Sequence, residues 1–487
     1  MSTTTALTAP PTSPADQVAR LVDLLVDRTA SLTWAQLDPD AQSSTRALML
    51  DALGLAAAAP AAPSLTPTAV AFTRLAGTPS SDTGVHVPFW GSFPGPGDAA
   101  SALSVAIHAW DFDDTHDGAV VHTACVALPA ALATAQECGA DGKRMLEGVV
   151  AGVEVLSRLG LALGPQHGVI RTAGLGALAA AASSARVLGL DPDHTRAALS
   201  LALSATLAPT SRQVVSDSAV NKRHQPSLAV RSGMTAAYLA AEGVEGPPGW
   251  WSGEHGLGRA VTDPAAAARH LAEPGWEVTR VSLKPIPACR YAHAAVAGVL
   301  ELTRGRRVSA AAAPDVEVHL PVGSTHVMVA RPYARRGLPI VDAQFSVPWL
   351  VAAALLRGGV GLPEMADDVL GDANIEYVAR HRVTCVQDQD PGTGVMTPVV
   401  VGLTDVDGLR SVVVDHLPGS PERRLTPEEQ RAKLLGCVAV VGRPSDVADT
   451  LAALVADLEN LSADELGRRL AADTTALRPH HLEALHG

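Results

Sequence analysis

The feature that most limits how this chain can fold is the spacing of its apolar residues, which changes twice along the sequence. From about residue 15 to residue 274, alanine and leucine recur every three or four residues, and the segments end at glycine or proline, as helices do. From about Trp276 onward, valine-rich segments alternate apolar and polar residues in the manner of strands. The helical spacing returns after residue 424.

This change of spacing predicts a mainly α protein with two domains. A large all-helical domain would be built from both chain ends, residues 15–274 and 425–487. A smaller α+β lid domain would be inserted between them, residues 275–424, with one helix at about 346–356 interrupting its strands.

The composition supports a well-packed globular protein. Hydrophobic residues make up 47% of the chain and aromatic residues 3%, so the core must be built from small aliphatic side chains. Fifty acidic residues against 37 basic ones give a net charge of −13. A chain this acidic, without a basic run, is a poor partner for nucleic acid or an anionic membrane. An anionic substrate would need a local cluster of cations.

The cysteines and the N-terminus indicate the compartment. The five cysteines are odd in number and form no CxxC pair, so neither a disulfide framework nor a zinc or iron–sulfur site is expected. The first residues lack the basic and apolar regions of a signal peptide. Charges such as Glu154 and Arg158 interrupt the apolar stretches. We therefore expect a cytoplasmic protein without a membrane span.

The segment "HAWDFDDTHDGAVVH", residues 108–122, holds four aspartates and three histidines in 15 residues. The spacing of His108, Asp111 and Thr115 predicts that they share one helix face, with Asp113 and Asp114 pointing elsewhere. The segment could act as an acid–base centre. It could equally be a solvated acidic loop between two helices.

His122 ends this segment where a second helix is expected to begin. The positive end of that helix would keep the imidazole neutral and suited to act as a base or hydrogen-bond partner. Aspartate and histidine are metal ligands, but their spacing here matches no standard motif, so no metal site is predicted.

Three other segments place cations beside apolar helices. Each could be a surface turn, or a clamp for a carboxylate. Together with the aspartates they supply an acid, a base and several cations, which fits proton transfer next to a carboxylate. Their polar residues are Lys222, Arg223 and His224; His167, Arg171 and Thr172; and Lys284, Arg290 and His293.

Seven segments in order resemble the successive signatures of the MmgE/PrpD family across roughly residues 40–440. They are "DFDDT…H…PAALATAQ", "GVEVLSRLG", "RTAGLGALAAAASSARVLGLD", "NKRHQPSLAVRSGMTAAYLA", "EGPPGWWSGEHGLG", "KPIPACRYAH" and "DAQFSVPWLVAAALLRGGV". The family includes 2-methylcitrate dehydratase, cis-aconitate decarboxylase and iminodisuccinate epimerase. The resemblance implies a helical domain with an α+β lid, a homodimer, and no metal or organic cofactor.

The resemblance also implies a site between the helical domain and the lid. The implied catalytic residues are Asp111, His122, Lys222 and His293. Thr115 also matches the family pattern. Together with the polar clusters above, it gives a predicted substrate-binding set of Thr115, Ile170, Arg171, Thr172, His224 and Arg290.

Two positions depart from the family pattern. Ile170 stands where the family usually has a histidine, and His224 falls one place early, with Gln225 at the usual histidine position. Ile170 cannot move a proton and removes a polar partner that a tricarboxylate would use. The pocket is therefore predicted to take a more apolar or larger carboxylate, as in secondary metabolism.

The leading functional prediction is a cofactor-independent hydro-lyase that dehydrates a β-hydroxy carboxylate. Cations would hold the carboxylate and spread the enediolate charge, while one group removes a proton and another protonates the leaving oxygen. Decarboxylation or epimerisation of a related acid is the first alternative. A catalytically inactive homologue that binds a carboxylate or a protein is the second.

Overall fold

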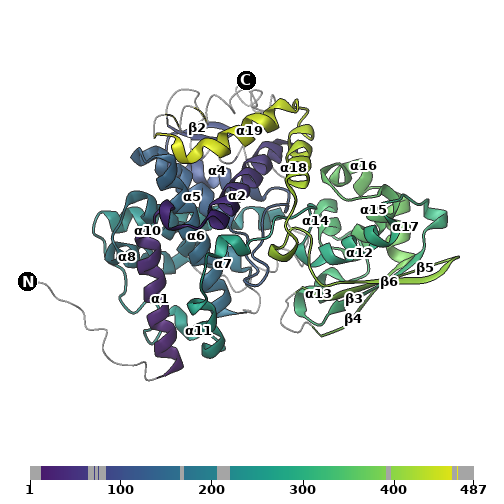
Figure 1. Cartoon of the computed structure of the whole chain (residues 1–487), viewed down its shortest axis with the longest axis horizontal. Coiled ribbons are helices and arrows are strands. Elements are labelled where there is room, and N and C mark those ends of the chain that lie inside the picture. Colours follow the sequence, from purple (N-terminus) through teal and green to yellow (C-terminus); the bar gives the residue numbers. More distant parts are fainter. Residues whose placement is uncertain are drawn as a thin grey trace, which may run out of the picture.

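The computed structural model shows two parts side by side, a larger helical body and a smaller lid (Figure 1). The described residues are 13–63, 68, 71, 75, 84–164, 169–205, 220–390, 396–462, 465 and 469.

The body is a bundle of closely packed helices. Small residues allow this packing: a Cβ on Gly233 of α10 would lie 2.2 Å from the Ala177 carbonyl oxygen of α7. A Cβ on Gly152 of α6 would meet the Ser183 hydroxyl of α7 at 2.1 Å. The helices are α1 (Pro14–Ala30), α2 (Pro39–Ala58), α4 (Pro96–His108), α5 (Ala124–Cys138), α6 (Gly142–Leu163), α7 (Arg171–Leu188), α8 (Pro192–Ala202), α10 (Gln225–Ala241) and α11 (Pro264–Ala272).

Local signals explain where these helices begin and end. Asp141 and Asp191 cap α6 and α8 by accepting from the backbone N–H three residues on. Helix α7 ends at Gly189, whose φ of 76° is the left-handed conformation that glycine adopts without strain.

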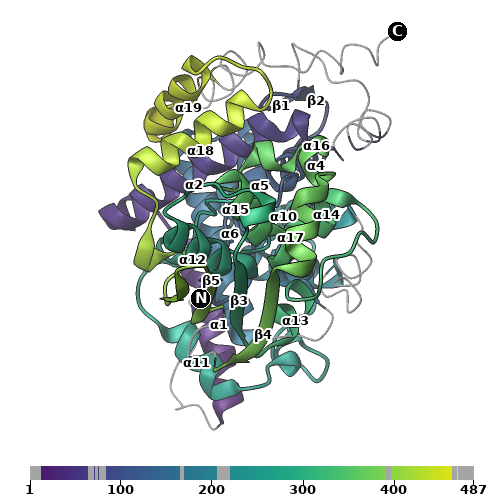
Figure 2. The same cartoon turned by 90° about the vertical axis from the view of Figure 1, so that its right-hand side faces the viewer.

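The lid is built on a four-stranded sheet in the order β4-β3-β5-β6. Strand β3 pairs with β4 in parallel and with β5 antiparallel, and β5 pairs with β6 antiparallel. Helices α12 and α15 pack against the sheet (Figure 2). The strands are β3 (Asp315–Pro321), β4 (Val383–Gln389), β5 (Val399–Asp405) and β6 (Gly408–Val414). The helices are α12 (His293–Thr303), α13 (Ser324–Val329), α14 (Pro339–Gln344), α15 (Val347–Arg357), α16 (Asp367–Leu370) and α17 (Ala373–His381).

The chain then returns to the body. Helix α18 (Pro427–Ala439) starts with a capping box between Thr426 and Glu429, and α19 (Asp446–Asp457) follows it. Both pack on α2, at the opposite end of the sequence. The protein is mainly α, as predicted, and this arrangement is consistent with a body made from both chain ends.

Two local predictions were wrong. The segment from Trp276 to Ala288 alternates like a strand but forms a 3-10 turn at Glu277–Arg280 and an isolated bridge between Ser282 and Thr115. Two prolines, at 285 and 287, disfavour a ladder at the end of this segment, because proline cannot donate to it. A short hairpin, β1 (Val85–Val87) with β2 (Gly91–Phe93), interrupts the region predicted to be helical throughout.

None of the helices in the described ranges is both long enough and apolar enough to cross a bilayer.

Candidate active site

The aspartate-rich segment is a buried irregular loop, not the helix face predicted for His108, Asp111 and Thr115. Helix α4 ends at His108, and Asp111 has a φ of 51°. That left-handed value is rare for a residue with a side chain and turns the loop back on itself. As a result, Asp113 points to His108 and Asp114 reaches the start of α5.

Asp114 anchors the far end of this loop. Its carboxyl oxygens accept from the backbone N–H groups of Thr123 and Ala124 and from the Thr123 hydroxyl, at 2.7–2.9 Å. Burial, together with the charge of Asp113, raises the pKa of Asp114 to about 7. Asp114 therefore fixes the loop to α5 and does not face the pocket.

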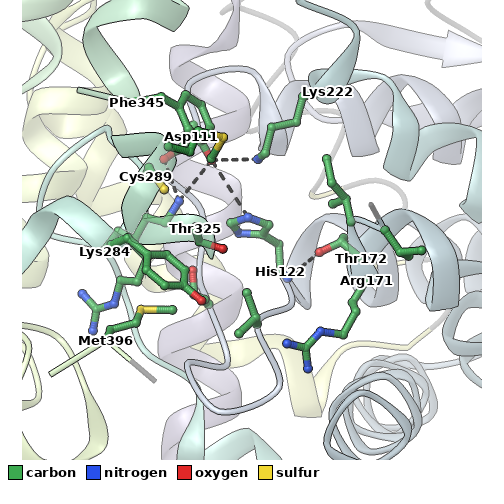
Figure 3. A pocket seen from close by; sticks show the side chains of 17 residues that line it. Asp111, His122, Arg171, Thr172, Lys222, Lys284, Cys289, Thr325, Phe345 and Met396 are labelled. Carbon is green, nitrogen blue, oxygen red and sulfur yellow. Dashed lines mark hydrogen bonds and ion pairs between the residues drawn. The ribbon is translucent and has the colours of Figure 1, made fainter. Parts of the chain in front are cut away.

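A pocket of about 670 Å³, including its solvent-open mouth, lies at the junction of body and lid (Figure 3). Its body side is lined by Asp111, Thr115, Val120, His122, Val169, Ile170, Arg171, Thr172 and Lys222. The segments that follow the body line the rest with Lys284, Cys289, Arg290, Tyr291, Thr325, Met328, Phe345 and Met396.

Asp111 is surrounded by cations. Its Oδ1 lies 3.1 Å from Lys222 Nζ and 3.2 Å from Lys284 Nζ, and its Oδ2 lies 3.3 Å from Arg223. Burial alone would raise the pKa of the Asp111 carboxyl, but these three cations lower it well below its usual range. Asp111 is therefore a fixed carboxylate that holds two lysines at the pocket.

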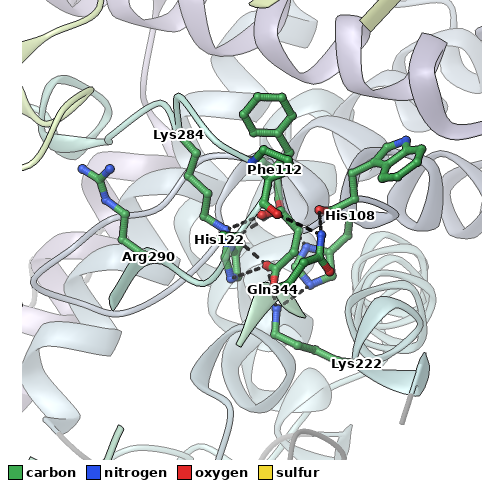
Figure 4. Close-up of polar contacts among 12 residues, drawn as sticks. His108, Phe112, His122, Lys222, Lys284, Arg290 and Gln344 are labelled. Atoms are coloured by element: carbon green, nitrogen blue, oxygen red, sulfur yellow. Dashed lines mark hydrogen bonds and ion pairs between the residues drawn. The ribbon is translucent and has the colours of Figure 1, made fainter. Parts of the chain in front are cut away.

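Lys222 connects Asp111 to a second carboxylate through a histidine (Figure 4). Its Nζ lies 3.1 Å from His108 Nε2, and His108 Nδ1 lies 2.8 Å from Asp113 Oδ2. Because an ammonium group can only donate, His108 Nε2 accepts and its Nδ1–H donates to Asp113. Burial lowers the pKa of His108 to about 4, so the ring is neutral.

His122 presents an unprotonated nitrogen near Asp111. Its Nδ1 lies 2.8 Å from the Asp114 carbonyl oxygen, which can only accept, so Nδ1 carries the proton. Its Nε2 is therefore the basic atom, 4.0 Å from Asp111 Oδ1. Burial lowers the pKa of His122 well below 6.5, and the charges of Lys284 and Lys222 act in the same direction against Asp113. The His122 imidazole is therefore neutral, with burial as the main cause.

The start of α7 forms another part of the wall. Ile170 is the residue before the helix, and Arg171 and Thr172 are its first two residues. The Thr172 hydroxyl accepts from the His122 backbone N–H at 2.9 Å, which ties this wall to the segment that carries His122. Arg171 donates to the Gly160 carbonyl at 3.0 Å. Thr115 also lines the pocket, and its buried hydroxyl has no hydrogen-bond partner in the described part of the chain.

Two predicted site residues do not reach the pocket. His293 is buried behind it, with Nδ1 3.3 Å from Arg290 and Nε2 3.2 Å from the Ala288 carbonyl oxygen. His224 lies 2.5 Å from the Thr68 hydroxyl and is absent from the lining residues. The expectation that His293 lines the same cleft as Asp111 is therefore wrong.

Arg290 lines the pocket, but its charge is already paired. Its guanidinium lies 3.0 Å from Asp117 and donates to the Pro418 carbonyl at 2.7 Å. These contacts join the lid to the aspartate-rich segment at Asp117.

Sequence reasoning missed several residues of this site. Lys284 was recognised as a cation of the "KPIPACRYAH" segment, yet not assigned to the site that it enters fully buried. The proline that follows Lys284 was the sequence signal that could have assigned Lys284 to the site. The lid residues Thr325, Met328 and Met396 lie outside every motif, and Phe345 lies in the "DAQFSVPWLVAAALLRGGV" segment without being assigned to the site, because their role depends on how the lid folds against the body.

Four of these groups could in principle hold a metal ion. His108, Asp111, Asp113 and His122 each offer a ligand atom within 4.8 Å of the others. However, Lys222 and Lys284 already place their ammonium groups on Asp111, where a divalent cation would be repelled. His108 uses both ring nitrogens within the same network. The donor set is therefore a poor fit for a metal.

Fold and site together define a mainly helical protein with a lid and a cationic pocket at the junction. Residues 24–270 match the MmgE/PrpD N-terminal domain, and residues 286–459 match the MmgE/PrpD C-terminal domain. The chain belongs to the MmgE/PrpD family.

Curated relatives are distant. The chain is 25% identical over 378 residues to the cis-aconitate decarboxylase-like protein oryM of Aspergillus oryzae, covering 70% of this chain and 75% of that protein. It is 26% identical over 331 residues to a cis-aconitate decarboxylase of Aspergillus terreus, covering 62% of this chain and 66% of that enzyme. The match thus spans about two thirds to three quarters of these relatives.

Proposed function

We propose that this protein is a cofactor-independent lyase that removes a proton next to a carboxylate. The observation that carries the proposal is the neutral His122, whose basic Nε2 lies at a pocket with a strong local excess of cations. Asp111 is the carboxylate among the lining residues, against the cations Arg171, Lys222 and Lys284, while the charge of Arg290 is paired with Asp117. In a chain with a net charge of −13, this excess supports an anionic substrate.

In this proposal His122 is the base and Lys222 the acid. His122 Nε2 accepts the proton from the carbon next to the carboxylate, and Lys222 and Lys284 stabilise the enediolate charge that develops. Burial lowers the pKa of Lys222, which makes its ammonium a better proton donor. Lys222 uses two N–H groups on Asp111 and His108, which leaves a third for the leaving oxygen.

Dehydration of a β-hydroxy carboxylate is the leading reaction, because an acid and a base flanking the same pocket suit the loss of water. Decarboxylation of a related acid is the second candidate, and the names of the Aspergillus relatives favour it. Ile170 argues against a cis-aconitate type of decarboxylation, because it cannot replace a histidine in proton transfer.

The proposed substrate carries an apolar substituent larger than that of a citrate-type acid. Ile170 is one of several apolar residues that share the pocket with the cations. The others are Val120, Val169, Met328, Phe345 and Met396. Replacing Ile170 by histidine should shift the preference toward small polar acids by roughly tenfold, the scale of a single apolar or polar contact.

The experiment is turnover of a panel of hydroxy acids and unsaturated acids, with and without alkyl substituents, in the presence of a chelator. Mass analysis of the products separates loss of water from loss of carbon dioxide. His122→Gln should abolish turnover, whereas His194→Gln, on the exposed start of α8, should not. Binding of the acids without turnover, in both the parent protein and its variants, would instead support an inactive carboxylate-binding homologue.

We also propose that the protein acts as a homodimer, as the family resemblance implies. Small apolar residues on helices permit flat contacts between subunits. Light scattering at micromolar protein should give twice the mass of the chain, and a monomer mass would refute the proposal.

A further inference from the structure

The loop that carries Asp111 is held by four side chains from outside it, three of them from distant parts of the chain. It has no helical or strand hydrogen bonding of its own between α4 and Thr115. Four of its backbone carbonyls instead accept hydrogen bonds from side chains. Three of these donor side chains, Gln344, Lys284 and His122, are labelled in Figure 4. The donors are Gln344 to Trp110 at 2.6 Å, Lys284 to Asp111 at 2.8 Å, Lys433 to Phe112 at 2.9 Å and His122 to Asp114 at 2.8 Å.

Lys433 differs from the other three donors. Lys284 and His122 line the pocket, and Gln344 accepts from Arg223, which contacts Asp111. Lys433 is not a lining residue and comes from α18, in the C-terminal part of the chain. The hydrogen bond that connects Lys433 to the site therefore runs through the loop.

The contacts of Lys433 are those of a buried, fully engaged ammonium group. Its Nζ lies 2.6 Å from Asp51 Oδ1 on α2, and both side chains are almost fully buried, with exposures of 6% and 7%. The same Nζ lies 4.1 Å from the centre of the Phe112 ring, a cation–π distance. Lys433 thus holds Phe112 by both its carbonyl and its ring, while Asp51 fixes the ammonium.

Phe112 stands between the two carboxylates that matter most to the pocket. Asp111, before it, carries the lysines, and Asp113, after it, orients His108. Asp111 also adopts a left-handed conformation, which persists only where surrounding contacts impose it. Releasing the Phe112 carbonyl would let the next peptide rotate and would move both carboxylates.

We propose that Lys433 is a positioning residue of the candidate active site. It holds the Phe112 peptide from behind so that Asp111 and Asp113 keep Lys222 and His108 in place. The catalytic consequence rests on the proposed lyase function. The structural consequence does not, because it can be measured without substrate.

The variants must separate positioning from folding. Lys433→Met alone leaves Asp51 as a buried charge without its ammonium partner, which can unfold the protein. The double variant Lys433→Met with Asp51→Leu removes both charges together and is the main test. Arg46→Met is the matched control, because Arg46 also joins α2 to the C-terminal segment, through Glu459 at 2.5 Å, but does not contact the loop.

The first readout is the imidazole N–H signals of His108 and His122 in protein labelled with 15N-histidine, assigned from His→Gln variants. The double variant should stay folded yet shift both signals, whereas Arg46→Met should leave them in place. The second readout is turnover, which should fall roughly 10- to 100-fold in the double variant, the effect of a small displacement of reacting groups.

Unchanged histidine signals in a folded double variant would overturn the proposal. A fall in turnover without a shift of these signals would overturn it as well, because Lys433 would then act by another route. A shift in the signals of a protein that turns over no acid would support the positioning role while contradicting the lyase function.

Discussion

Two clusters of buried charged side chains in the described part of the chain differ in whether the protein itself pairs all their polar groups. The pocket cluster faces the cavity between body and lid and consists of His108, Asp111, Asp113, His122, Lys222 and Lys284. The core cluster lies inside the body and consists of His116, Glu154, Arg158 and Glu277.

In the core cluster the protein itself satisfies the charges. Arg158 pairs with Glu154 at 2.8 Å and Glu277 at 3.2 Å. Its remaining N–H groups reach the backbone carbonyls of four residues at 3.0–3.4 Å. These residues are His270, Leu271, Glu273 and Gly275. This arrangement fixes α6, α11 and the turn after them, and it leaves no charge for a ligand.

The pocket cluster is incomplete by comparison. Thr115 has a buried hydroxyl without a partner in the described residues, and Asp111 Oδ2 lacks a hydrogen bond of good geometry there. His122 keeps a basic nitrogen that no described hydrogen bond uses. Burial of charge alone therefore does not identify a functional site. A functional site is indicated where buried polar groups lack a protein partner and can bind a ligand.

The largest expected effect that follows from this comparison is on turnover. Lys222→Met should lower kcat/KM by roughly 10³-fold or more, because it removes both the charge at the developing enediolate and the proposed proton donor. The thermal unfolding midpoint should stay close to that of the parent protein, since Lys284 and Arg223 still pair with Asp111 when Lys222 is replaced. Steady-state kinetics and a thermal scan check this.

Normal turnover by the Lys222 variant would place the chemistry elsewhere. A large fall in its unfolding midpoint would instead make the pocket cluster structural, like the core cluster.

A substitution in the core cluster should instead lower the stability of the protein and leave turnover unchanged. Arg158→Met leaves Glu154 and Glu277 buried without their shared cation, which should cost about 3–5 kcal/mol of stability. The unfolding midpoint should fall clearly, while the folded fraction should keep its kcat. Retention of the parent midpoint would break the distinction between the two clusters.

The next expected effect is on the pH dependence of kcat/KM, which should fall about tenfold per pH unit below the pKa of the base. Because burial and the two lysines lower the pKa of His122 below 6.5, the base remains unprotonated as the pH falls through that value. The acid limb of kcat/KM should therefore have its midpoint below pH 6.5. Asp113→Asn should move it lower still, since the charge of Asp113 raises the pKa of His122. An acid limb above pH 6.5 would argue against His122 as the base.

Much of this architecture could be predicted from the sequence, because it depends on local patterns. Apolar spacing located the body helices and strands β3 to β6, and ordered motifs pointed to Asp111 and Lys222. His108 and Asp113 were not assigned to the site, because that required the loop to turn back at Asp111. No pattern predicts a left-handed conformation at an aspartate.

The contacts of His293 show a second limit of prediction from the sequence. It belongs to the motif that carries Lys284, yet Lys284 enters the site while His293 turns away to Arg290 and a backbone carbonyl. Residues nine positions apart in one motif are separated by a 3-10 turn, Arg290–Ala292, whose direction the motif does not encode.

Metal removal is expected to leave activity unchanged, which is the smallest of the predicted effects. It tests whether the pocket cluster binds a metal at all. The pocket cluster contains a geometry that could bind a metal, with four ligand atoms within 4.8 Å. A divalent ion there would have to displace Lys222 and Lys284 from Asp111, and His108 would have to give up its bond to Lys222 or to Asp113. Two ammonium groups already neutralise the carboxylate, so the ion would gain little attraction and would meet strong repulsion. Activity after exhaustive chelation should equal that of untreated protein, and added zinc or iron should not increase it. Activity that is lost on chelation and restored by one metal would show that the lysines yield their place, and the proposed roles of Lys222 and Asp111 would then have to be abandoned.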